Sequence, residues 1–130
     1  MARVSSKTLL TADPTLEGVR FAPETEAATY FCCLEALQNC AKHASGAPAE
    51  VHLTLEDAWL VFSVSDAGPG FDVSSTRDGT GLHGMADRLA AIGGTLEVRS
   101  QPGHGTVVSG RVPTLEAARQ GARKSTLGLM

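Results

Sequence analysis

The sequence predicts an α+β fold, a two-layer α/β sandwich in which helices back one face of a mixed, mostly antiparallel sheet. Two stretches show helical periodicity, one from Pro23 to about Ala44 and one from Leu82 to Ile92. Two pairs of segments alternate apolar and polar residues and predict hairpins, over residues 51–64 and 96–112. No segment repeats along the chain, so we expect these elements to build one domain.

Composition excludes several classes of function. The net charge of −3 gives no basic face for nucleic acid. No apolar run approaches the roughly 20 residues that span a bilayer, and residues 1–10 lack the apolar core of a signal peptide. Cysteines 32, 33 and 40 fall within one predicted helix and favour reduced thiols. We expect a cytoplasmic domain without direct nucleic-acid or membrane contact, although the parent protein could be membrane-anchored.

The first helix is expected to begin at Pro23, where Glu24 and Glu26 suit the helix dipole. Its apolar stripe is expected to face the sheet and comprises Ala27, Tyr30, Leu34, Leu37 and Ala41. Residues 1–22 read as a lead-in with room for one short strand, and residues 114–130 as a flexible tail. The domain itself is therefore expected to span residues 23–113.

The polar residues Glu35, Asn39, Lys42 and His43 fall on the side of this helix away from the apolar stripe. One interpretation is a solvated helix face. The other is a site for Mg²⁺ and phosphate, since Asn39 offers a neutral oxygen ligand. In that case Lys42 neutralises phosphate charge and Glu35 orients or activates an attacking group.

The segment Asp66-Ala67-Gly68-Pro69-Gly70 follows a predicted strand. A carboxylate only accepts hydrogen bonds, so Asp66 could recognise an exocyclic amine such as that of adenine. Gly68 and Gly70 would remove side chains where a flat base approaches the backbone. The alternative is a plain strand-to-loop turn.

Residues 79–84, Gly-Thr-Gly-Leu-His-Gly, match the residue pattern of the dinucleotide-binding fingerprint but not its structural context. That fingerprint requires a preceding strand and an acid about 20 residues further on. Here the polar residues 74–78 precede it and the later position holds no acid. A Walker loop is excluded because no Gly-Lys-Ser/Thr occurs. A glycine-rich loop that leads into a helix N-terminus remains, which is a potential anion site.

In combination these segments resemble the ATP-binding domain of sensor histidine kinases, within the superfamily shared with gyrase and mismatch-repair ATPases. Residues 34–44 resemble the N box of that family and residues 64–71 its G1 box. Residues 79–96 resemble the G2 region, and residues 102–113 the terminal hairpin. The Gly-Leu-x-Gly-Met and Lys-His-Ala forms are most similar to the nitrate-sensor-like group.

The resemblance implies the Bergerat-type ATP-binding fold and a site for ATP and Mg²⁺. It implies ATP-binding roles at Asn39, His43, Asp66, Gly68, Gly70, Gly79, Thr80, Gly81, Leu82, Gly84 and Thr106. Asn39 would ligate Mg²⁺, Glu35 would be the general base and Lys42 would lie near the phosphates. Asp66 would bind the adenine amine, assisted through water by Thr106.

One feature departs from the family. The kinases carry a phospho-accepting histidine followed by an acid on a dimerisation helix, and none of the histidines here precedes an acid. We therefore expect the phosphoryl group to pass to a histidine on a dimerisation domain outside this chain, with a DNA-binding response regulator downstream. The alternatives are a standalone anti-sigma-factor serine kinase and a degenerate module that has lost its nucleotide.

Overall fold

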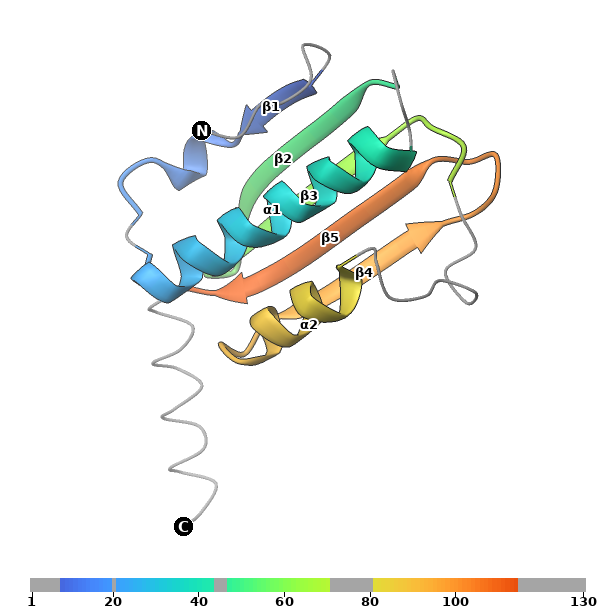
Figure 1. Cartoon of the computed structure of the whole chain (residues 1–130). Helices are drawn as coiled ribbons and strands as arrows, with labels where there is room; N and C mark the ends of the chain where they lie inside the picture. Colours follow the sequence, from blue (N-terminus) through green and yellow to red (C-terminus); the bar gives the residue numbers. More distant parts are fainter. Residues whose placement is uncertain (1–7, 20, 44–46, 71–80, 115–130) are drawn as a thin grey trace.

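The computed structural model describes residues 8–19, 21–43, 47–70 and 81–114. Five strands and two α-helices follow one another in the order β1 (Thr8–Ala12), α1 (Pro23–His43), β2 (Ala49–Glu56), β3 (Trp59–Asp66), α2 (Leu82–Ala90), β4 (Thr95–Ser100) and β5 (Thr106–Pro113), with a short 3-10 helix at Pro14–Leu16. The strands form one sheet in the order β1-β2-β3-β5-β4. Both α-helices lie on the same face of it (Figure 1). The predicted two-layer fold is confirmed.

Strand β1 makes the lead-in part of the sheet. It pairs in parallel with β2, from Thr8 opposite Ala49 to Ala12 opposite Leu53. The backbone N–H of Asp13 then donates to the Leu53 carbonyl at 2.9 Å. The short strand for which the lead-in left room is therefore present, and it belongs to the sheet.

The first residue of the expected C-terminal tail also packs against the sheet. Thr114, expected in the tail, is buried, and its backbone N–H donates to the Ala58 carbonyl at 3.1 Å. Its hydroxyl donates to the same carbonyl at 2.5 Å. The domain therefore includes residue 114, and the rest of the expected tail lies outside the described residues.

Both predicted hairpins are present. Strands β2 and β3 pair antiparallel across Asp57 and Ala58, whose φ angles are 50° and 66°. Positive φ at both central residues is typical of the type I′ turn, whose twist matches that of the strands. Strands β4 and β5 pair antiparallel, with Ser100 opposite Thr106.

The expected apolar stripe of α1 is wrong except at Leu37, which packs partly buried against the core. Tyr30 is 60% exposed, and Ala27 and Ala41 are also exposed. The buried residues of the helix are instead small ones: Thr25, Ala28, Thr29, Cys32 and Ala36. At roughly 100° per residue this face lies about half a turn from the predicted one. Hydropathy missed it because threonine scores as polar, yet the Thr29 hydroxyl bonds to the Thr25 carbonyl at 2.8 Å.

Helix α2 is fixed to both the sheet and α1. Met85 and Leu89 are fully buried in the core, together with Phe62 of β3. The Cys32 thiol lies 3.8 Å from the Met85 carbonyl. On the outer side, the Arg88 guanidinium stacks 4.0 Å from the centroid of the Phe31 ring. These contacts set the position of the α2 N-terminus relative to α1.

Gly110 of β5 offers a test of this core. A β-carbon at Gly110 would overlap the buried Phe62 ring and lie 3.0 Å from a Leu89 methyl carbon. We expect Gly110→Ala to lower the free energy of unfolding by about 1–3 kcal/mol, as overpacking does. Denaturant titration measures the loss. The control Ser109→Ala, on the opposite face of the same strand, is expected to change it by less than about 0.5 kcal/mol.

Candidate functional site

Two segments far apart in the sequence lie against the second half of α1 (Figure 1). They are the end of β3 and the start of α2. The Cys40 thiol on α1 contacts the Asp66 carboxylate at the end of β3. Five residues earlier on α1, the Glu35 carboxylate lies beside Gly81 at the start of α2. Glu35, one residue of the predicted polar face, therefore faces α2, whereas Lys42 is exposed.

Asp66 is the last residue of β3 and is half-buried. One carboxylate oxygen, Oδ1, accepts a hydrogen bond from the backbone N–H of Gly68 at 2.9 Å. The other, Oδ2, lies 3.3 Å from the Cys40 Sγ, which donates to it. A carboxylate offers about four lone-pair sites, so capacity for a ligand donor remains on both oxygens.

Two glycines let the loop after β3 pass close to the β4–β5 connection. Gly70 has a φ of 67°, and a β-carbon there would overlap the Gln101 carbonyl. Gly105 has a φ of 74°, and a β-carbon there would overlap the Asp66 carbonyl. Packing alone therefore explains glycine at both positions, whereas the expectation for Gly70 invoked room for a base.

Thr106 also lies at this end of the sheet, opposite Asp66 in the β3–β5 pairing. Its hydroxyl lies 2.8 Å from the Ser100 hydroxyl, which also contacts the Gly105 carbonyl at 3.0 Å. Ser100 is a residue that the motifs did not indicate. Only the pairing of β4 with β5 brings it here.

The N-terminus of α2 begins at Gly81, whose φ of 73° is left-handed. A β-carbon at Gly81 would lie 2.8 Å from Glu35 Oε2. Leu82 packs partly buried against the core. Gly84 differs, because it is exposed and an added β-carbon would meet nothing within 4 Å. Within the described structure, packing does not explain glycine at position 84.

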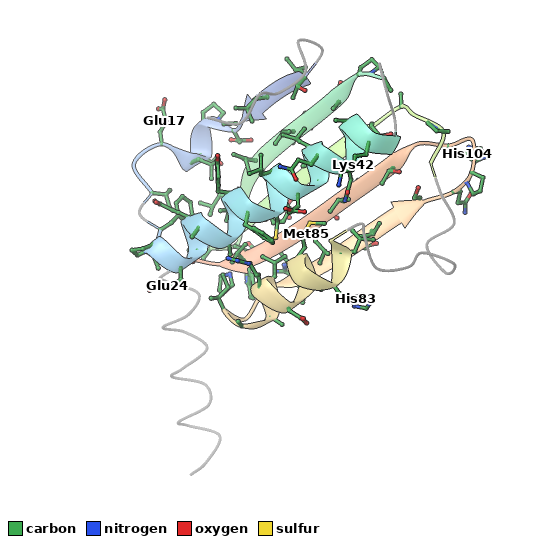
Figure 2. The ribbon with its side chains drawn as sticks, in the orientation of Figure 1. Glu17, Glu24, Lys42, His83, Met85 and His104 are labelled. Atoms are coloured by element: carbon green, nitrogen blue, oxygen red, sulfur yellow. The ribbon has the colours of Figure 1, made fainter. Side chains whose placement is uncertain are left out.

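The remaining predicted residues lie nearby or outside the described ranges. Lys42 is exposed near the end of α1, on the helical side of the sheet, and His43 is the last residue of that helix (Figure 2). Gly79 and Thr80 lie outside the described residues. The contact between Cys40 and Asp66 was not predicted from the sequence.

Side chains that commonly bind metals are few at this end of the described structure. Among the described residues there is no group of three or more His, Cys, Asp or Glu side chains that could hold a metal ion. Asn39 on α1 supplies a neutral oxygen, and Mg²⁺ bound to phosphates needs only one or two protein ligands. Separately, no helix within the described ranges is long and apolar enough to cross a membrane.

Comparison with known proteins identifies this arrangement. Residues 25–116 match the family model described as histidine kinase-, DNA gyrase B-, and HSP90-like ATPase. The histidine-protein kinase/phosphatase DegS of Brevibacillus brevis is 36% identical over 100 residues, which cover 75% of this chain and 25% of DegS. The oxygen sensor histidine kinase NreB of Staphylococcus carnosus is 38% identical over 96 residues, 72% of this chain and 28% of NreB. The chain thus spans about a quarter of these relatives.

Solved structures agree on the fold. The histidine kinase domain of the blue-light activated kinase EL346 from Erythrobacter litoralis has a TM-score of 0.65 at 22% identity, covering 85% of this chain and 53% of that one. The catalytic domain of the histidine kinase ThkA has a TM-score of 0.67 at 15% identity, covering 82% of this chain and 78% of that one. The anti-sigma-factor alternative is not favoured. The chain belongs to the histidine kinase-, DNA gyrase B- and HSP90-like ATPase family, as an ATP-binding domain of the sensor histidine kinase type.

Proposed function

We propose that this chain is the catalytic domain of a two-component sensor histidine kinase and donates the γ-phosphoryl group of Mg·ATP to a histidine on a dimerisation domain. The observation that supports this best is that Asp66 lies against Cys40 and the α2 N-terminus lies against Glu35, both on the second half of α1. A carboxylate for a base and a helix terminus for phosphates are the two ends of a nucleotide site. The histidine kinases among the relatives support the same reaction.

Asp66 is the proposed adenine-binding residue. Its carboxylate accepts a hydrogen bond from the exocyclic amine, and Gly68 and Gly70 flank the base. The Gly68 N–H already bonds to Oδ1, so this carboxylate oxygen is held before the nucleotide arrives. Thr106 lies opposite Asp66 across the ladder and assists through a water molecule.

The phosphates are proposed to lie at the N-terminus of α2. The first backbone N–H groups of a helix have no partner within the helix and attract anions. Gly81 and Gly84, together with Gly79, Thr80 and the Leu82 backbone, contribute to this end. The open space at Gly84 allows close approach of a phosphate oxygen to the backbone.

The transfer chemistry is assigned to α1. Asn39 would hold Mg²⁺, which supplies charge neutralisation on the phosphate oxygens when bound. Lys42 and His43 add donors near the phosphates. The Glu35 carboxylate accepts the proton of the attacking imidazole or orients that ring, which is the role of a general base.

The domain would work in the cytoplasm with two partners. The first is the dimerisation domain that carries the acceptor histidine, and the second is a DNA-binding response regulator that receives the phosphoryl group. Only the histidine itself must reach the γ-phosphate, so catalysis depends mainly on positioning.

Transfer is the direct test. With labelled ATP, the isolated chain is expected to bind nucleotide and to label itself little. Addition of a dimerisation domain from a kinase of the same type is expected to yield a labelled histidine, recognised by its acid-labile phosphate. Strong acid-stable labelling of the chain alone would contradict the proposal.

Replacement of Asp66 tests the base end. Asp66→Asn removes the charge and places an amide donor against the adenine amine, so ATP affinity is expected to fall at least about 10-fold. Fluorescent ATP-analogue titration measures it. The control Asp87→Asn changes the same charge on an exposed residue of α2. Equal affinities for Asp66→Asn and the unmodified chain would overturn the adenine assignment.

Replacement of Gly84 tests the phosphate end. Alanine favours a helix by about 0.5–1 kcal/mol over glycine, so Gly84→Ala is expected to raise the free energy of unfolding. ATP affinity is expected to fall, because the new methyl group occupies the phosphate approach. The control Asp87→Ala also raises helix propensity and should leave binding unchanged. Denaturation and ATP titration of both variants give the comparison, and unchanged ATP affinity in Gly84→Ala would remove this residue from the site.

A further inference from the structure

Cys40 touches the residue on which base recognition depends. It lies on α1 directly after Asn39, and its thiol donates to Asp66 Oδ2 at 3.3 Å. Cys33 and Cys40 both pack partly buried against the hydrophobic core, but within the described residues only Cys40 also contacts Asp66. The two thiols share a helix and a partly buried setting, but they have different surroundings.

The Cys40 thiol remains a donor at neutral pH. Burial, followed by the hydrogen bond to Asp66 and its charge, raises the pKa of Cys40 to about 12 from an ordinary value of 9.0. The sulfur therefore keeps its proton in the folded chain, and the carboxylate can only accept. Cys40 is therefore the donor of this hydrogen bond and Asp66 the acceptor.

Two donors from different elements hold the carboxylate. The terminal torsion of an aspartate side chain is broad, so a single hydrogen bond leaves the carboxylate plane poorly defined. Gly68, in the loop after β3, holds Oδ1 at 2.9 Å, and Cys40 on α1 holds Oδ2. Together they define the plane, and with it the direction of the remaining lone pairs.

We propose that Cys40 is a positioning residue for base recognition, whose S–H···O bond aims the Asp66 carboxylate at the exocyclic amine of adenine. This inference rests on the proposed function, in which Asp66 binds that amine. It assigns to Cys40 an effect on selectivity between bases, because the thiol acts through the carboxylate and not through the phosphates. A general loss of folded structure would weaken the binding of all nucleotides equally.

The test compares ATP with inosine triphosphate, which carries an oxygen in place of the amine. Dissociation constants of both are measured for the full chain and for Cys40→Ala. A typical hydrogen bond contributes about 1 kcal/mol net, or about five-fold in affinity. We expect the ATP affinity of Cys40→Ala to fall by about that factor, while its affinity for inosine triphosphate changes little. The selectivity ratio, the ATP affinity divided by the inosine triphosphate affinity, therefore falls.

Three further variants make the result decisive. Cys33→Ala removes a partly buried thiol that packs against the core, and the ratio should stay unchanged. Cys40→Ser restores a donor and should recover part of the ratio; a ratio no better than that of Cys40→Ala overturns the donor role. Where thermal unfolding shows that Cys40→Ala is not folded, Cys40→Val gives the same comparison with a donor-free side chain of similar volume.

Asp66→Asn separates failure of this inference from failure of the proposed function. If Asp66→Asn loses selectivity and Cys40→Ala keeps it, the positioning role of Cys40 is wrong and the adenine assignment stands. If both variants keep the selectivity of the unmodified chain, the adenine assignment itself is wrong. Loss of selectivity in both, with Cys33→Ala unaffected, supports the positioning role.

Discussion

The close approach of α1 to the sheet is the constraint on which the rest of the structure depends. Ala28, Cys32 and Ala36 are almost fully buried and short, so the helix axis can lie near the strands. The same side of the helix carries Asn39 and Cys40 one turn later. A bulkier residue in the buried series would lift the helix and separate Cys40 from Asp66, so core packing and site geometry share one helix face.

The site is assembled from elements that are fixed independently. The end of β3 is held by its pairing with β5 and by the close passage of Gly70 and Gly105 along neighbouring backbone. Helix α2 is held by Met85 and by the Arg88–Phe31 contact. Charged groups placed by rigid elements lose little conformational entropy on binding, which favours affinity for a nucleotide.

Much of this arrangement could be predicted from sequence because it is local. The alternation in β2 and β3, the glycines after α2 and the order of the motifs fixed the fold class and the family. The buried face of α1 could not be predicted, since threonine and cysteine are weak hydrophobic signals although both pack well here. The contact between Cys40 and Asp66 spans 26 residues and arises only from packing of α1 on the sheet. The roles of the individual site residues remain predictions.

Strand β1 carries a consequence for how this domain can be handled. It covers the row of backbone N–H and C=O groups along β2 that would otherwise be unpaired. Exposed strand edges recruit other chains and promote aggregation. A shortened domain that started at Pro23, just before the family match at residues 25–116, would uncover that row. Poor solubility of such a fragment would then reflect a missing neighbour strand and not a defect in the nucleotide site.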